Sequence, residues 1–211
     1  MKKIKLPIND TFSVKITADD LNKEGVETLP NGITKIPIGQ LGGTTQSNEL
    51  KIARENGSKV IWSTLWIEKK IEEIITKYLF STKSGKNTSR SFFIHEIMQH
   101  NSCSFNFKKN LVLKIINKES LLIPIEKPKL EKSLKDIMMI RNAFAHGELS
   151  FDIKDGVILS YYSGGNISIN IDDDYLNKIE DTFSTAKVLL EKSISTLVEK
   201  KQEFKEDEIT Q

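Results

Sequence analysis

Arg141 and His146 are the pair of residues whose types and spacing best suit chemistry. They lie five positions apart in the segment Arg-Asn-Ala-Phe-Ala-His-Gly, which ends at Gly147. An imidazole titrates near neutral pH and can move protons, and a guanidinium can bind a phosphate through two parallel charged hydrogen bonds. RNA cleavage without a metal needs both functions, because the 2′-hydroxyl loses a proton, the leaving 5′-oxygen gains one, and negative charge develops on the phosphate. The pair therefore predicts a ribonuclease site.

The position of this segment at a predicted helix end affects how the two side chains can meet. On a regular helix, residues five apart point about 140° away from each other, so Arg141 and His146 would not share a face. Gly147 is expected to end the helix in a left-handed cap, which would loosen the last turn and let His146 approach Arg141. Asn142 has an amide that can fix the imidazole or contact a phosphate. The alternative is a purely structural helix end with a solvated arginine.

Hydrophobic periodicity predicts the elements that hold this segment in place. The predicted helices cover residues 47–80, 90–118 (with a break near 101–104), 128–147 and 172–200. An Asp-Gly pair at 155–156 and a Gly-Gly pair at 164–165 mark turns between alternating apolar residues, which predicts a three-stranded antiparallel meander at about 149–171. The fold class is therefore mainly α: a helical bundle over residues 47–200, with a small antiparallel β-meander inserted before the last helix.

The same pattern predicts buried faces and helix ends. Trp62 and Trp66 are four positions apart in the first helix and are expected to pack on a partner helix. Pro128 suits the first turn of the third helix, and one of Asp172 to Asp174 is expected to cap the last helix. The predicted core positions are Ile67, Ile71, Ile74, Ile75 and Tyr78 in the first helix, Leu130, Leu134, Ile137 and Met138 in the third, and Leu176, Ile179, Phe183, Ala186, Leu190, Ile194 and Leu197 in the last.

The two ends of the chain give weaker patterns. Residues 1–46 are expected to form an arm that is partly irregular, with short strands at Ile4–Leu6 and Phe12–Ile16. The glycines in 39–43 are expected to form a surface loop, because they lack the spacing and the following Lys-Ser/Thr of a nucleotide loop. Residues 201–211 form a charged tail that is expected to fray.

The composition is that of one domain with a core of its own. The chain has 211 residues, of which 38% are hydrophobic and 28% charged. The net charge of +2 is too small to indicate nucleic-acid binding by itself, so any basic surface must be local. Cys103 is the single cysteine, which excludes an intramolecular disulfide and suits a reducing compartment. With neither an apolar run of signal-peptide length nor a stretch of about 20 apolar residues, we expect a cytoplasmic protein with no membrane partner.

Lysines near the segment can form a surface that follows an RNA backbone. The main candidates are Lys129, Lys132 and Lys135, with Lys108, Lys109 and Lys127 also nearby in sequence. If these residues bind phosphates, the affinity for RNA falls steeply with added salt. The alternative is a set of solvated lysines with no such role.

Three other groups of residues are weaker candidates. His95, His100 and Cys103 can suggest a metal site, but no second cluster accompanies them and the two histidines are not spaced to share a helix face, so no metal is expected. The three aspartates at 172–174 can suggest calcium, although a helix start explains them better. The acidic residues that can orient the catalytic pair are Glu68, Glu72 and Glu96, and the sequence does not distinguish among them.

The segment Ile140–Gly147 resembles the Arg-x4–6-His motif of the HEPN superfamily, in its Arg-Asn-x-x-x-His form. The resemblance in helix order covers residues 47–200, and the resemblance in sequence is concentrated in this segment. It implies a HEPN-like helical bundle and a metal-independent endoribonuclease of a toxin–antitoxin, abortive-infection or antiviral system, acting on RNA rather than DNA and without a cofactor. It also implies a homodimer with two motifs in one composite cleft. Arg141 would bind the scissile phosphate, His146 would be the acid–base residue, and Asn142 would support them.

The chain departs from the family pattern at Glu148. Some HEPN toxins carry a tyrosine two positions after the histidine, which a nucleotidyltransferase antitoxin modifies, and Glu148 occupies that position here. Control by an antitoxin or another regulatory protein therefore stays open. Some HEPN proteins only bind nucleotides or act as scaffolds, so a non-catalytic nucleotide- or protein-binding module is the alternative function.

Overall fold

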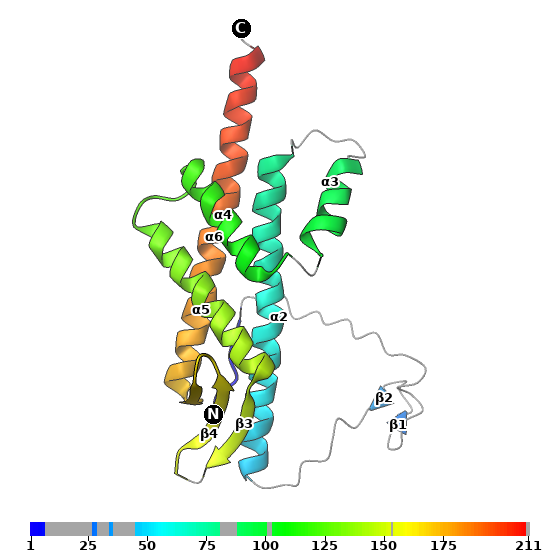
Figure 1. Cartoon of the computed structure of the whole chain (residues 1–211). Coiled ribbons are helices and arrows are strands. Elements are labelled where there is room, and N and C mark those ends of the chain that lie inside the picture. Colours follow the sequence, from blue (N-terminus) through cyan, green and yellow to red (C-terminus); the bar gives the residue numbers. More distant parts are fainter. Residues whose placement is uncertain are drawn as a thin grey trace.

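Two long helices, α2 (Thr45–Leu79) and α6 (Asp173–Ile209), run side by side through the protein (Figure 1). The helix α5 (Glu126–His146) packs against both of them, and α4 (Phe105–Lys118) packs against α2 and α5. The computed structural model describes residues 1–6, 27–28, 34–35, 45–80, 88–100, 103–152 and 154–209. The protein is mainly helical, with a small antiparallel sheet before the last helix, so the predicted fold class is confirmed.

The second helical region is interrupted, as predicted. It begins with a short α-helix, α3 (Thr88–Phe92), which continues into the π-helical turn η1 (Phe93–Met98). A new helix, α4, then begins after Ser104, whose hydroxyl accepts a hydrogen bond from the backbone N–H of Phe107 at 3.3 Å. This contact satisfies one of the free N–H groups that every helix start presents. Residues 101 and 102, inside the predicted break, lie outside the described residues.

The core lies where α2, α5 and α6 meet. The predicted core positions with no exposed surface are Ile67, Ile71, Ile74, Ile75, Leu130, Leu134, Ile137, Leu176, Ile179, Phe183, Ala186 and Leu190. Leu197 is also buried, and Tyr78 and Ile194 are half-buried against the same core, whereas the predicted core position Met138 is half-buried and lines the cavities beside α5. Full burial of one large apolar side chain is worth about 1.5–3 kcal/mol, so these faces determine how the helices pack. Among the described residues, no helix combines the length and the apolar character needed to cross a bilayer.

The sheet between α5 and α6 consists of β3 (Glu148–Asp152), β4 (Gly156–Tyr162) and β5 (Asn166–Asn170). The three strands are antiparallel in the order β3-β4-β5, as expected for a meander. One face of β4 is buried against the helices, and the strands alternate between buried and more exposed positions. The residues aligned across the three strands on this buried face include Leu149, Leu159 and Ile169.

Glycines make both turns of this sheet possible. Gly156 has a φ of 74° and Gly164 a φ of 70°, in the left-handed region that side chains disfavour. The predicted Asp-Gly and Gly-Gly turns are therefore confirmed. A separate pair of short strands, β1 (Glu27–Thr28) and β2 (Thr34–Lys35), is antiparallel and lies in the N-terminal part of the chain.

Of two predictions about helix ends, one is confirmed and one needs correction. The helix α5 begins at Glu126, two residues before Pro128, so the proline lies within the first turn, as predicted. This is tolerated because the N–H groups of the first turn have no partner inside the helix. The last helix, α6, continues to Ile209 and does not end near residue 200, so the charged tail is helical over most of its length.

The prediction for the two tryptophans is correct for only one of them. Trp66 is half-buried against the core, with the ammonium groups of Lys70 and of Lys187 on α6 at 5.5 Å and 5.8 Å from its ring centroid. Trp62 is 53% exposed, so the expected packing on a partner helix is wrong for this residue. Four residues turn a helix by about 40° beyond one full turn, which moves Trp62 away from the buried face that Trp66 borders.

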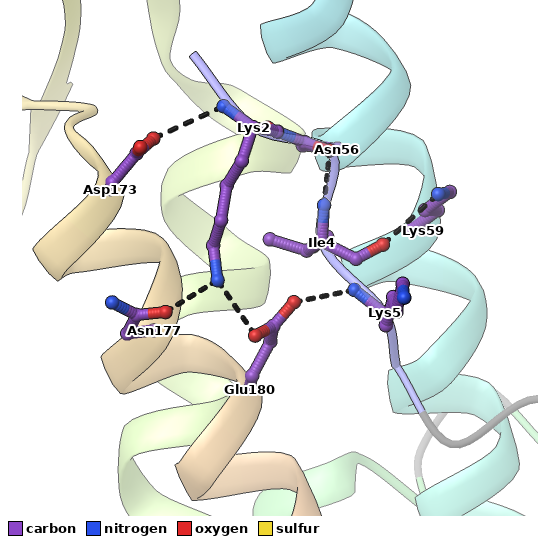
Figure 2. A network of polar contacts seen from close by, with 8 residues as sticks. All are labelled: Lys2, Ile4, Lys5, Asn56, Lys59, Asp173, Asn177 and Glu180. Atoms are coloured by element: carbon purple, nitrogen blue, oxygen red, sulfur yellow. Dashed lines mark hydrogen bonds and ion pairs between the residues drawn. The ribbon is translucent and has the colours of Figure 1, made fainter.

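The first six residues lie between α2 and α6 (Figure 2). Ile4 is completely buried, and its backbone N–H donates to Asn56 Oδ1 on α2 at 3.1 Å. The backbone N–H of Lys5 donates to Glu180 Oε1 on α6 at 2.6 Å. A strand was expected at Ile4–Leu6 and does not form, because these backbone groups bind helix side chains instead of a neighbouring strand.

Side chains of the same segment complete the attachment to α6. The ammonium of Lys2 donates to Asn177 Oδ1 at 2.5 Å and to Glu180 Oε2 at 2.8 Å (Figure 2). Asn56 also donates from Nδ2 to the carbonyl oxygen of Lys2 at 3.0 Å, so both ends of its amide bind the segment. The other predictions for the arm, a strand at Phe12–Ile16 and a loop over 39–43, lie outside the described residues.

Candidate functional site

The helix that carries the Arg-His segment stays regular to its end. The backbone N–H of Gly147 donates to the carbonyl oxygen of Ala143 at 2.8 Å, as in an uninterrupted α-helix. Gly147 has φ −87° and ψ 166°, so the expected left-handed cap is wrong and His146 does not sit in a loosened turn. The reason is that the chain passes directly into β3. A Cβ on Gly147 would lie 2.4 Å from Ala143 O and 2.7 Å from Leu159 Cδ1, so glycine is required here for close packing.

The end of α5 is held against α2 by a similarly close contact. A Cβ on Gly57 of α2 would lie 2.8 Å from Cδ1 of Phe144, so the phenyl ring packs directly on the α2 backbone. Ala143, which precedes Phe144 on α5, is 1% exposed. Because small residues allow the two helices to approach closely, the last turns of α5 have a fixed position relative to α2.

All three predicted site residues point toward solvent. Arg141, Asn142 and His146 are exposed, so a ligand can reach each of them. Arg141 donates from Nη1 to Asn142 Oδ1 at 3.0 Å. This contact brings together two of the three residues, and it holds the guanidinium on the Asn142 side of the helix.

Two hollows flank the end of α5, and they separate the arginine from the histidine. The first, which we call the Arg141 cavity, has a volume of about 370 Å³ and lies between α2, α4 and α5; its lining includes Glu68, His100, Phe105, Lys108, Met138 and Arg141. The second, the His146 cavity, has a volume of about 320 Å³; its lining includes Met139, His146, Tyr161, Tyr162 and Ser163. Met138 and Asn142 line both. The expected approach of His146 to Arg141 within one chain is therefore not seen, because the helix keeps them about 140° apart.

A buried lysine lies at the Arg141 cavity between two carboxylates. Lys108 is only 4% exposed, and its Nζ lies 2.5 Å from Glu68 Oε1 and 2.6 Å from Glu72 Oε1. Burial by itself would lower the pKa of Lys108, but the hydrogen bonds that it donates to both carboxylates outweigh burial and raise that pKa above the usual 10.5. The lysine is therefore charged at neutral pH. Of the three acidic residues considered from the sequence, Glu68 lines this cavity, Glu72 holds Lys108, and Glu96 is exposed on η1.

The exposed face of α5 carries two of the predicted lysines together with two site residues. Positions 132, 135, 139, 142 and 146 are spaced by three or four and therefore share one helix face. Lys132, Lys135, Asn142 and His146 are exposed along it, and Met139 is 44% exposed. This face is about 21 Å long at 1.5 Å per residue. Lys129 is also exposed, but it lies about 100° around the helix from His146.

The other weak candidates have structural positions. His95 lies on η1 with Nδ1 3.3 Å from Gln99 Oε1, whereas His100 and Cys103 line the Arg141 cavity. Asp172 caps α6, since the backbone N–H of Tyr175 donates to its Oδ1 at 2.7 Å, as predicted. In the described part of the chain, no group of three or more His, Cys, Asp or Glu side chains is placed to hold a metal ion.

The sequence did not indicate the residues that β4 brings to the His146 cavity. Tyr161 and Tyr162 lie at the end of β4, and Tyr162 is 77% exposed. Tyr161 belongs to the alternating pattern that predicted the strand, but only the folded arrangement of β4 beside α5 places the two tyrosines near the histidine. Tyrosine combines a flat apolar ring with a hydroxyl, which suits contacts with a nucleotide.

Comparisons with known proteins do not assign the chain to a family. No protein-family model matches it, no curated protein matches it, and no solved structure matches it. Its function must therefore be argued from its own residues and their geometry.

Proposed function

We propose that the protein is a metal-independent endoribonuclease of the HEPN type, which attacks RNA through its 2′-hydroxyl and leaves a 2′,3′-cyclic phosphate. The observation that carries this proposal is the exposure of Arg141, Asn142 and His146 together at one helix end, between two hollows that meet at Asn142. The proposal places the enzyme in the cytoplasm, as a toxin or an antiviral or abortive-infection effector. An antitoxin or another regulatory protein would then restrain it.

In this proposal each site residue has a distinct role. Arg141 binds two oxygens of the scissile phosphate through its planar guanidinium and stabilises the charge that develops there. His146 transfers protons, and Asn142, already hydrogen-bonded to Arg141, positions the guanidinium. The exposed lysines Lys132 and Lys135 attract the RNA backbone toward the same helix face.

A second copy of the chain would complete the site. The reaction needs both a base and an acid, and one protomer offers one histidine at this helix end. An isologous dimer about a two-fold axis would bring two such helix ends together and supply both groups. Light scattering at micromolar concentration tests this part, and a monomer would refute the composite site.

The decisive experiment is cleavage of end-labelled single-stranded RNA in EDTA. We expect cleavage by the wild type, with cyclic-phosphate ends, and at least a 100-fold loss in His146→Ala, because acid–base catalysis typically contributes about 10²–10⁴ in rate. The matched control is His95→Ala, which removes another exposed imidazole and should cleave like the wild type. Equal rates for wild type and His146→Ala would refute the assignment.

A second variant tests direct phosphate contact. Arg141→Lys keeps the charge but loses the planar fork, so cleavage should be severely impaired. An unimpaired Arg141→Lys variant would mean that the guanidinium does not bind the phosphate in two-point fashion.

The second candidate is a non-catalytic nucleotide- or protein-binding module. The observation that favours it is the Arg141 cavity, whose volume of about 370 Å³ falls within the range of small-molecule sites. It predicts binding without turnover and no dependence on His146. Expression in cells is a rapid discriminator, because an active ribonuclease should slow growth in a His146-dependent way and a binding module should not.

A further inference from the structure

The lining of the Arg141 cavity can contact an organic group as well as a phosphate. Its walls include apolar side chains from three directions, with Leu65 on α2, Phe105 at the start of α4 and Met138 on α5. Polar side chains make up most of the remaining lining: Thr64, Glu68, Gln99, His100, Ser104, Lys108, Asn142 and the exposed Arg141. A cavity that combines apolar surfaces with hydrogen-bonding side chains can bind a flat polar group such as a nucleobase and orient it.

The cluster of Glu68, Lys108 and Glu72 carries a net negative charge on one side of the cavity, whereas Arg141, which also lines the cavity, is positive. Two carboxylates, Glu68 and Glu72, surround the one ammonium of Lys108, which leaves one net negative charge on the cluster. Lys108 is 4% exposed and is satisfied by these two partners, so it is not available to bind an anion. The side of the cavity at Glu68 therefore disfavours a phosphate and favours a group that donates hydrogen bonds, whereas the side at Arg141 favours an anion.

Glu68 is the carboxylate that can receive such donors. It lines the cavity, and 22% of its side chain is exposed, while Lys108 engages it through Oε1. A carboxylate has about four lone-pair positions on its two oxygens, so Glu68 can accept from Lys108 and from a ligand at once. Because Lys108 binds its Oε1, the orientation of Glu68 is set before a ligand arrives.

Guanine is the RNA base whose edge matches this acceptor. Its N1–H and its 2-amino group point in the same direction and can donate two parallel hydrogen bonds to one carboxylate. Adenine, cytosine and uracil each place an acceptor beside their donor on the same edge, so a carboxylate would meet one repulsive lone pair. The face of the base would pack on Phe105, as bases do on aromatic side chains in single-stranded RNA sites.

We propose that the Arg141 cavity binds the guanine base of the nucleotide adjoining the scissile phosphate, with Glu68 accepting from N1–H and the 2-amino group and Arg141 contacting the phosphate. This inference rests on the proposed function, since it takes RNA as the substrate. It makes Glu68 a specificity residue and gives the enzyme a preference for cleavage beside guanosine in single-stranded RNA.

Binding of mononucleotides to the full chain tests the base preference without any cleavage. 5′-GMP, 5′-IMP and 5′-AMP share the phosphate that Arg141 would contact, so differences among them report on the base alone. IMP keeps N1–H and lacks the 2-amino group. A good two-point contact discriminates by about 1–3 kcal/mol, so we expect titration calorimetry to give GMP at least about 5-fold tighter binding than IMP or AMP. Equal affinities for the three would overturn the proposal.

The chain offers a matched pair of variants for Glu68. Glu68→Gln and Glu72→Gln each remove one of the two charges that hold Lys108, so their effects on folding should be similar. Glu72 does not line the cavity, as far as the described residues show. We expect Glu68→Gln to abolish the preference for GMP and Glu72→Gln to keep it. Loss of the preference in both variants, or in neither, would overturn the assignment to Glu68.

Cleavage of oligonucleotides with a single guanosine, inosine or adenosine separates this inference from the proposed function. His146-dependent cleavage that ignores the base would overturn the guanine pocket and leave the ribonuclease intact. A Glu68-dependent preference for GMP in a protein that cleaves no RNA would support the pocket and refute the ribonuclease.

Discussion

Replacing Asn56 by alanine should destabilise the protein through the first six residues rather than through α2 itself. Asn56 is completely buried, and its amide makes two contacts with the N-terminal segment (Figure 2). It accepts from the N–H of Ile4 at 3.1 Å and donates to the carbonyl oxygen of Lys2 at 3.0 Å. The side chain is therefore a link between α2 and a segment that also binds α6.

The size of the effect follows from what becomes of the segment. If it stays in place, two hydrogen bonds are lost at about 1 kcal/mol each, and two backbone groups lose their partners. If it detaches, Ile4 becomes exposed, which costs about 1.5–3 kcal/mol. The two routes together predict that Asn56→Ala lowers the free energy of unfolding by about 1.5–4 kcal/mol.

Urea unfolding of Asn56→Ala, Ile4→Ala and the double variant measures this. Because both residues act through one segment, their effects should be less than additive by at least about 1 kcal/mol. Asn110→Ala, which changes an exposed asparagine of α4, is the control and should fall within about 0.5 kcal/mol of the wild type. Strictly additive effects, or an Asn56→Ala variant as stable as the control, would refute the linkage.

Three further predictions concern pH and close packing. Burial alone would raise the pKa of Glu180, but hydrogen bonds from Lys2 and from the Lys5 N–H outweigh burial and lower that pKa below 4.5. The wild type should therefore be more stable than Glu180→Gln in urea unfolding near pH 7, and this difference should shrink as the pH falls below about 4.5. If this difference were equal at pH 7 and pH 3, the linkage would be wrong. Burial, aided by the charge of Tyr161, raises the pKa of Tyr175 to about 12. Ultraviolet titration should therefore show a tyrosine that ionises well above pH 10, and this signal should be absent from Tyr175→Phe. The shifted pKa of Tyr175 contributes to folding stability below pH 10, and this contribution is lost as the pH rises toward 12. Four tyrosines titrating together near pH 10 would contradict this. Gly147→Ala should destabilise the protein by about 1–3 kcal/mol through overpacking, as measured by thermal unfolding. Gly165→Ala, where a Cβ meets nothing within 4 Å, is the control and should have nearly the wild-type melting temperature. Equal melting temperatures for the two variants would show that α5 and β4 can move apart at Gly147 at little cost.

Local pattern was sufficient to predict the helices, the sheet and both glycine turns, because periodicity and turn chemistry act over a few residues. It was not sufficient for Gly147, whose role depends on Leu159, a residue twelve positions away that packs against it. It also missed the burial of Ile4, because the partners Asn56 and Glu180 are distant in sequence and no periodicity marks a segment that binds through side chains.

The candidate site was predicted in composition but not in arrangement. Arg141, Asn142 and His146 could be identified from their types and spacing, and their exposure is consistent with that choice. Their division between two cavities depends on where α2, α4 and β4 lie, which spacing along one helix cannot reveal. Glu68 was one of three acidic candidates until packing placed it in the Arg141 cavity.

The inserted sheet allows the two sides of the site to evolve at different rates. Most of the wall of the Arg141 cavity belongs to helices that also form the core, so a substitution there also affects the stability of the bundle. The lining of the His146 cavity includes Tyr162 and Ser163, which lie at a solvent-exposed turn. The main requirement of this turn is a residue at position 164 that adopts a positive φ, as Gly164 does. Insertions and side-chain changes are best tolerated at such turns. Among descendants of this fold, diversity should therefore accumulate on the histidine side, while the arginine side stays conserved.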